Sequence, residues 1–201
     1  MASLVTAPSA TLAAGTWQID PAHSHVEFAV RHLMISTVKG RFGDLSGTVN
    51  VDGNDPSKSV VDVTINVASI DTREPKRDTH LRSADFFDVE RFPTLRFRST
   101  RVSGGPDDLK VTGDLKVTGQ LLVTGDLTIR DVTREVTLTI TPEGQGKDPW
   151  GSERAGYSAK AKINRGDFGL TWNQVLEAGG VLVGEEIKIS IDVEFVKQAA
   201  K

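Results

Sequence analysis

Apolar and polar residues alternate strictly along several stretches of the chain. The alternation is clearest in residues 61–67, 95–98, 136–141 and 187–195, where every second side chain is apolar and the others are polar or charged. A period of two residues is that of a β-strand with one buried and one exposed face, and antiparallel sheets commonly show it. The pattern predicts an all-β protein whose strands share one apolar interior, either a sandwich or a closed barrel, which leaves no strand edge exposed.

Helical periodicity is nearly absent from the sequence. The exception is the stretch from Asp78 to Ala84, where Asp78 can act as the N-cap of one or two turns. The sequence therefore predicts one or two short helical turns and no long helix.

Residues 108–131 form a tandem of hexapeptides, DLKVTG-DLKVTG-QLLVTG-DLTIRD. Because six is an even number, all odd positions fall on one face of an extended strand, and the even positions are almost all polar. A single strand of this length exceeds the usual range of about 3–10 residues. The repeat therefore predicts a long bent ribbon or an extra hairpin, with bends at Gly113, Gly119 and Gly125. A slip of six residues keeps every side chain on its face, so the pattern does not fix the register.

The length of the chain predicts one globular domain between two short tails. The sequence has 201 residues, within the range of a single domain. We expect a flexible N-terminal tail over residues 1–14, one domain over residues 15–197 and a C-terminal tail over residues 198–201. The N-terminus lacks the basic start and continuous apolar core of a secretory signal, and no apolar run reaches the roughly 18 residues of a membrane span. This predicts a cytoplasmic protein with no integral membrane segment; an exported form that begins near Thr16 is the alternative.

Composition excludes several classes of function. The net charge is −3, so no basic field is available to bind a nucleic acid backbone. The chain has no cysteine, which removes disulfides, thiolate metal ligands and cysteine nucleophiles together. Hydrophobic residues make up 38% of the chain, as is ordinary for a globular protein.

The histidines raise the question of a metal site. His23, His25 and His32 lie within ten residues of one another, and His80 is the fourth histidine of the chain. On one regular strand His23 and His25 share a face, whereas His32 points to the opposite side. No motif such as His-Glu-x-x-His accompanies them. The pattern therefore favours structural histidines over metal ligands, and no metal or other cofactor is expected.

Other chemical motifs are weak. The sequence contains neither a Gly-x-Ser-x-Gly elbow nor a phosphate-binding Gly-x-x-x-x-Gly-Lys loop. Asp85 and Asp88 flank Phe86 and Phe87, and we interpret the aromatic residues as anchors and the aspartates as caps or solvated groups. The Arg-Gly-Asp in residues 164–168 is interpreted as a turn.

Together, four segments resemble the YceI-like, or polyisoprenoid-binding, family. They are DPAHSHVEFAVRHLMISTVKGRF (20–42), HLRSADFFDVERFPTLRFRS (80–99), VTGDLTIRDVTREVTL (123–138) and INRGDFGLTWN (163–173). The resemblance implies an extended lipocalin-like antiparallel β-barrel whose apolar tunnel holds a long isoprenoid or similar lipid. It also implies a lipid carrier or store rather than an enzyme, with a homodimer as one option. Two features depart from the family pattern: Asp131 stands where glycine is usual, and about two hexapeptide units are extra.

The resemblance and the inward-facing pattern give a set of expected ligand contacts. Small inward residues, Gly113, Gly119, Gly125, Ala159 and Ala161, leave room inside the barrel, whereas Ile187 and Ile189 are large and apolar. The predicted lining and mouth residues are Phe28, Val30, Met34, Phe42, Phe86, Phe87, Phe92, Phe97, Ala159, Ala161, Phe168 and Trp172. Lys39 and Arg41 are candidates for an anionic head group, with a solvated surface pair as the alternative.

Two alternatives remain open at this point. The small residues Ala159 and Ala161 can instead pack beneath bulky neighbours in a filled core. A metal- or acid–base-dependent enzyme that acts on a hydrophobic substrate is the rival function.

Overall fold

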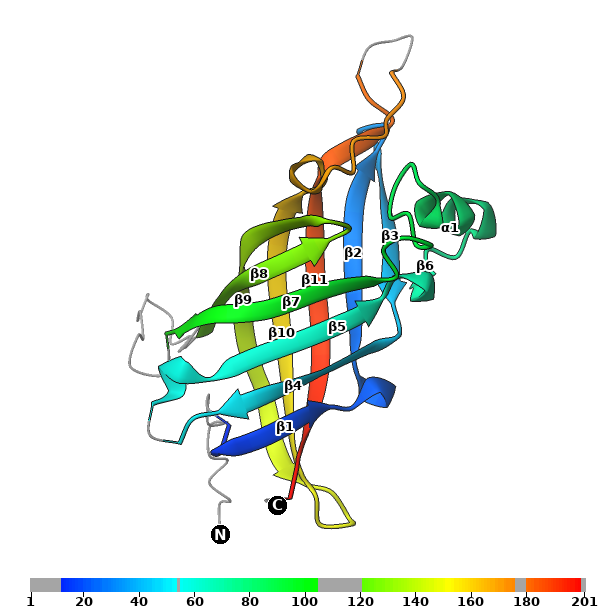
Figure 1. Cartoon of the computed structure of the whole chain (residues 1–201). Helices are drawn as coiled ribbons and strands as arrows, with labels where there is room; N and C mark the ends of the chain where they lie inside the picture. The colour runs from blue at the N-terminus through cyan, green and yellow to red at the C-terminus, as the bar shows by residue number, and fades with distance from the viewer. Residues whose placement is uncertain (1–11, 54, 105–120, 176–179, 200–201) are drawn as a thin grey trace, which may run out of the picture.

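The computed structural model describes residues 12–53, 55–104, 121–175 and 180–199, which form an antiparallel sheet closed into a barrel (Figure 1). Within these residues the sheet has 11 strands. They are β1 (Gly15–Ile19), β2 (His25–His32), β3 (Ser36–Phe42), β4 (Leu45–Val51), β5 (Val60–Asn66), β6 (Ile70–Asp71), β7 (Thr94–Ser103), β8 (Leu121–Ile129), β9 (Val132–Lys147), β10 (Glu153–Asn164) and β11 (Val183–Lys197).

Strand β11 closes the barrel because it pairs with three other strands. One of its edges pairs with β10. Along the other edge, its N-terminal part (residues 183–192) pairs with β2 and its C-terminal part (residues 195–197) pairs with β1. Among the described residues the closed ring runs β1-β4-β5-β7-β8-β9-β10-β11, and β2, β3 and β6 continue the sheet beyond it. The predicted all-β, lipocalin-like antiparallel barrel is confirmed.

The alternation in the sequence determines which side chains enter the barrel. On β5, Val63 and Ile65 line the interior. Asp62, which precedes Val63, lies on the outer face and forms ion pairs with Arg96 and Arg98 of β7, at 2.9 and 2.8 Å. Strands β9, β10 and β11 place their apolar positions inside in the same way. The predicted division into two faces is therefore confirmed.

Helix α1 (Pro75–Arg82) begins earlier than the sequence analysis predicted. Pro75 lies in the first turn, where its missing N–H costs no hydrogen bond. Glu74 is the N-cap, and its side chain accepts a hydrogen bond from a backbone N–H of this turn. Asp78 is buried inside the helix and accepts hydrogen bonds from the backbone N–H and the hydroxyl of Thr72, at 2.9 and 2.5 Å. The prediction of Asp78 as the N-cap is therefore wrong.

The remaining helical elements are single 3-10 turns. Those described are η1 (Pro21–His23), η2 (Pro56–Lys58), η3 (Val67–Ser69) and η5 (Arg165–Phe168). In the part of the chain that the structure describes, no helix is long and apolar enough to cross a membrane.

Two glycines make room for phenylalanine rings of neighbouring strands. A Cβ atom at Gly125 would overlap the Arg98 carbonyl oxygen and lie 2.7 Å from Cζ of Phe97. A Cβ atom at Gly40 would overlap the Phe28 ring, lying 2.8 Å from its Cε1. The space at Gly125 is thus filled by Phe97 and is not room for a ligand, which corrects the sequence-based expectation for this glycine.

The hexapeptide repeat is described only in its last part. Residues 121–129 form β8, whereas the hexads up to residue 120, with Gly113 and Gly119, lie outside the described residues. The turn from β8 to β9 forms with Asp131 in place of the usual glycine. Arg130, and not Asp131, has a positive φ there (58°), so glycine is not required at position 131.

We expect Gly125→Ala to lower the free energy of unfolding by about 1–3 kcal/mol, as overpacking of a core does. The new methyl group would collide with the backbone of β7, which cannot move aside as a side chain does. Gly43→Ala is the matched control, because nothing lies within 4 Å of a Cβ atom there. Urea denaturation of both variants measures the difference. Equal midpoints for the two variants would contradict the close approach at Gly125.

Candidate functional site

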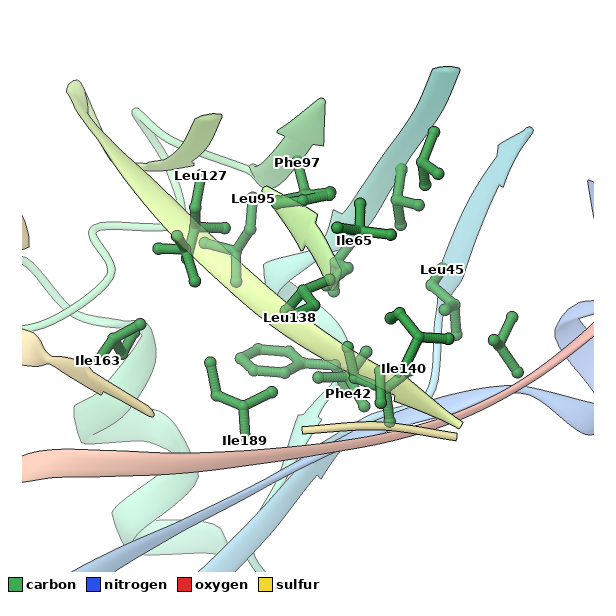
Figure 2. A pocket seen from close by; sticks show the side chains of 18 of the residues that line it. Phe42, Leu45, Ile65, Leu95, Phe97, Leu127, Leu138, Ile140, Ile163 and Ile189 are labelled. Carbon is green, nitrogen blue, oxygen red and sulfur yellow. The ribbon is translucent and has the colours of Figure 1, made fainter. Parts of the chain in front are cut away.

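An apolar cavity of about 600 Å³ occupies the interior of the barrel. Small-molecule sites typically have volumes of about 300–1,000 Å³. Figure 2 shows side chains from different strands, among them Phe42, Leu138 and Ile189, that point into this space. The polar or charged side chains among the described lining residues are those of Ser57, Ser59, Ser103, Tyr157 and Arg165.

Most of the residues predicted to contact a ligand line this cavity. They come from strands β2, β3, β7, β10 and β11 and from the segment after α1. Those in the lining are Phe28, Val30, Phe42, Phe86, Phe87, Phe97 and Ala159, together with Ile187 and Ile189. Their contact with a ligand remains a prediction.

Two of the predicted residues lie on the outside of the barrel. Met34 is 59% exposed in the turn between β2 and β3, where its φ is positive (59°). The guanidinium groups of Arg91 and Arg130 lie over the Phe92 ring, 5.0 and 5.6 Å from its centre. Both were chosen for their apolar side chains, but the chain turns away from the barrel interior at these positions.

Three further predicted residues are buried or half-buried without lining the cavity. Phe168 is 1% exposed and belongs to the packed core. Trp172 packs behind the wall, 5.3 Å from the Phe86 ring and 4.6 Å from the His80 ring between centres. Ala161 packs against the core but is absent from the lining. The loop after β10 thus takes both aromatic residues out of the cavity.

The predicted head-group residues, Lys39 and Arg41, lie on the outer face of β3. Both are exposed and neither lines the cavity. Arg41 forms an ion pair with Asp71 at 3.5 Å. Their position agrees with the alternative interpretation as solvated surface residues.

The sequence analysis missed the aliphatic part of the lining. Leu45 of β4, Leu127 of β8, and Leu138 and Ile140 of β9 all face the cavity (Figure 2). They occupy the inward-facing positions of the same alternating pattern that predicted the strands, so the pattern alone is enough to predict them as lining residues. The predicted lining is mainly aromatic and does not include these four positions.

Arg165 is a buried cation at the edge of the cavity. The residue is 5% exposed, and within the described part of the chain no carboxylate lies within ion-pair distance of it. Its Nε donates to the carbonyl of Gly184 at 2.9 Å, and its Nη2 to that of Val183 at 3.4 Å. Its Nη1 donates to the carbonyls of Leu170 and Trp172 at 2.5 and 2.8 Å. Burial lowers the pKa of Arg165, yet an arginine stays charged in proteins. The Arg-Gly-Asp tripeptide is therefore a turn, as predicted, whereas the burial of its arginine was not predicted.

Tyr157 is the other titratable residue in the described lining. It lines the cavity, but its hydroxyl is buried and has no hydrogen-bond partner among the residues that the structure describes. Burial raises the pKa of Tyr157 to about 12. The phenol therefore stays neutral at physiological pH and adds only weak polarity to the interior.

The four histidines lie apart from the cavity and do not converge. His23 lies in η1 and not on a strand with His25, which corrects the assumption behind their shared face. His25 lies 3.5 Å from Asp192 on the outer face, and His80 lies 2.8 Å from Asp85. Among the described residues, no group of potential metal ligands contains two histidines.

Arg154 of β10 joins carboxylates from three parts of the chain. It contacts Asp20 at 2.7 Å, Asp148 at 2.8 Å, and Glu194. Ligand atoms of Asp20, His23 and Glu194 lie within 4.8 Å of one another, but the guanidinium group already supplies positive charge to both carboxylates. These contacts raise the pKa of Arg154. The cluster connects β1, β10 and β11 where the barrel closes.

We expect this cluster to contribute stability that is lost at acid pH. Hydrogen bonds from Arg154, and then from His23, lower the pKa of Asp20 from 3.8 to about 2. Because the folded state binds this proton less well than the unfolded state, Asp20 stabilises the fold fully above about pH 4. The contribution, about 1–2 kcal/mol, disappears as the pH falls towards 2. Urea midpoints at pH 5 and pH 2.5 should therefore differ less for Asp20→Asn than for the unchanged protein. An identical pH dependence would contradict the assigned role of Asp20.

Comparison with known proteins places this barrel in a family. The family model of the YceI-like domain matches residues 17–195. "Protein YceI" of Salmonella newport is 39% identical over 200 residues, which cover 98% of this chain and 95% of that protein.

Two solved structures show the same architecture. The Campylobacter jejuni YCEI protein has a TM-score of 0.62 and 30% identity, over 84% of this chain and 90% of its own. A polyisoprenoid binding domain from Saccharophagus degradans has a TM-score of 0.63 and 14% identity, over 90% of this chain and 98% of its own, which shows a shared fold. With its barrel, its apolar cavity and a family match over almost its whole length, the chain belongs to the YceI-like domain family.

Proposed function

We propose that the protein binds one long apolar lipid, of the polyisoprenoid or isoprenoid quinone type, in the barrel interior and carries or stores it without catalysis. The observation that carries this proposal is the cavity, whose described lining is mainly aliphatic and aromatic. The similar fold of a domain described as polyisoprenoid binding supports the same ligand class.

The energetics of chain burial support binding in such a cavity. Each buried methylene contributes roughly 0.8 kcal/mol. Association and ordering of a flexible chain cost roughly 4–15 kcal/mol. A few buried isoprene units are therefore enough to offset these costs, without strong polar contacts.

The chemistry of the lining favours binding over the rival enzymatic function. Among the described lining residues, Arg165 and Tyr157 are the titratable ones, and no histidine or carboxylate faces the cavity. General acid–base catalysis requires such a group within reach of the reacting atoms. A hydrophobic substrate in this cavity would therefore meet no side chain suited to move a proton.

Mass spectrometry of lipid extracted from the purified protein tests the proposal. We expect stoichiometric isoprenoid lipid from the unchanged protein and little from Ala159→Phe, in which the cavity is partly filled. Metal analysis of the same sample separates the rival function. Absence of lipid, or stoichiometric zinc or iron, would overturn the proposal.

The homodimer and the cytoplasmic location predicted from the sequence are part of the same proposal. Sedimentation of the purified protein tests the first, and cell fractionation tests the second.

A further inference from the structure

We infer that the lipid lies in one orientation, with its head at the serine end of the cavity and the end of its tail against Phe87, which limits the chain length that fits. The serine end is the part of the lining formed by Ser57, Ser59, Ser103 and Gly104. This inference rests on the proposed function and adds to it an orientation and a residue that determines specificity.

The serine end is the solvent-exposed part of the described lining. Among the described lining residues, Ser57, Ser103 and Gly104 are the exposed ones, and all others are buried or half-buried. Turn η2, which contains Ser57, lies against β7, which ends at Ser103, so these residues share one end of the barrel. The serines of the lining all belong to this end. A polar head group placed here keeps its hydrogen bonds to water, which a buried polar group loses at considerable cost.

The opposite end of the cavity is closed by the segment that contains α1, residues 72–93. Leu81, Phe86 and Phe87 of this segment face the cavity. The Phe87 ring meets the Phe42 ring edge-on at 5.9 Å between centres, and Phe86 is buried against Trp172 at 5.3 Å. Leu81 and Phe87 are half-buried, and Phe86 is almost fully buried. The side chains that this segment contributes to the lining are thus all apolar and suit the end of a hydrocarbon chain.

This segment is held firmly to the sheet. The Arg82 guanidinium donates to the carbonyls of Ala68 and Ile70, at 3.1 and 2.7 Å. Buried Asp78 fixes Thr72 at the start of the segment. The aspartates that flank Phe86 and Phe87 form local ion pairs rather than caps: Asp85 pairs with His80, and buried Asp88 accepts a hydrogen bond from Arg91. A longer chain therefore cannot be accommodated simply by displacing the segment.

Strand β5 connects the two ends of the cavity. Strand β5 runs from Val60, beside the serine end, to Asn66, which is followed by η3 and then the α1 segment. Seven residues of strand span about 20 Å. Val61, Val63 and Ile65 line the cavity along this path. A linear chain laid along β5 therefore has its two ends in chemically different surroundings.

The positive charge of Arg165 does not favour the opposite orientation, with the head group at the buried end. It is the only charged side chain in the described lining, but each of its three nitrogen atoms already donates to a main-chain carbonyl. A diphosphate would require several free cationic donors at the buried end. The geometry therefore fits a lipid whose head stays at the serine end.

The test measures how affinity depends on chain length, with linear prenols that differ by one isoprene unit as probes. We expect affinity to rise with length up to an optimum and then to level off or fall. In Phe87→Ala the optimum should move up by at least one unit, and in Leu81→Phe it should move down. Leu138→Ala, on the side wall, is the matched control: it should weaken binding of all lengths and leave the optimum unchanged.

The outcomes separate the inference from the proposed function. If the unchanged protein binds no prenol of any length, lipid binding itself fails. If it binds them but the optimum is the same in Phe87→Ala, Leu81→Phe and Leu138→Ala, the role of Phe87 is wrong. Phe87→Leu, which keeps an apolar side chain, serves where the alanine variant does not fold, and an unchanged optimum in it overturns the inference equally.

Discussion

Replacing Arg165 with methionine is expected to lower the free energy of unfolding by at least about 3 kcal/mol. The guanidinium group connects η5 to the start of β11 through the carbonyls of Leu170, Trp172 and Gly184. Methionine fills similar space but donates no hydrogen bond. These carbonyls would lose a donor, and a buried acceptor without a partner costs about 1–3 kcal/mol. Urea denaturation measures the loss.

Arg134→Met is the matched control for this variant. Arg134 is exposed, and the hydrogen bond described for it goes to the carbonyl of its neighbour Thr133. Surface substitutions of this kind usually change stability by less than about 0.5 kcal/mol. If Arg165→Met unfolds at the same urea concentration as Arg134→Met, the buried arginine is not the structural element described above.

Ala159→Phe is expected to weaken lipid binding by about tenfold or more while the ligand-free protein keeps its stability. Ala159 faces the cavity between Ile140 and Ile191 of the neighbouring strands. A phenyl ring there enters space that the lipid would otherwise occupy, and a tenfold loss corresponds to about 1.4 kcal/mol of binding free energy. Lipid affinity and the urea midpoint should be measured on the same preparation.

Ala161→Phe provides the contrast, because Ala161 faces the packed core and does not line the cavity. A phenyl ring there would meet the packed core, so we expect this variant to lose about 1–3 kcal/mol of stability. Its affinity per folded molecule should change little. A large loss of stability in Ala159→Phe would mean that the interior is a filled core at this position, the alternative that the sequence left open.

The faces of the strands could be predicted from sequence because a period of two leaves little choice. Once Val63 and Ile65 are placed inside, Asp62 must lie outside, and the structure has this arrangement. The neighbours of each strand were not predictable in the same way. The crowding of Gly125 by Phe97 depends on the pairing of β7 with β8, which alternation does not specify.

Residues outside regular strands were the hardest to place. Phe168 and Trp172 are aromatic and close to the end of β10, so composition favoured the cavity for both. The chain leaves the barrel wall in η5, and hydrogen bonds from Arg165 to the carbonyls of Leu170 and Trp172 fix the path of the loop that follows. Contacts between residues far apart in sequence decide that path, and no local pattern encodes them. Pro75 could have predicted the start of α1, because proline is common in the first turn of a helix. Asp78 has a side chain typical of an N-cap, but it is a buried hydrogen-bond acceptor instead.

The position of β11 also determines when the cavity can exist during synthesis. This last strand supplies one neighbour to β10 and pairs with both β1 and β2 at the other end of the sequence. A growing chain on the ribosome therefore exposes an open, curled sheet with apolar residues until residues 183–197 have emerged. Pairings this distant in sequence also slow folding, and such exposed sheets are prone to aggregate. A nascent chain is thus unable to enclose a lipid in the closed barrel before β11 is translated, and lipid that reaches it earlier meets an unclosed surface.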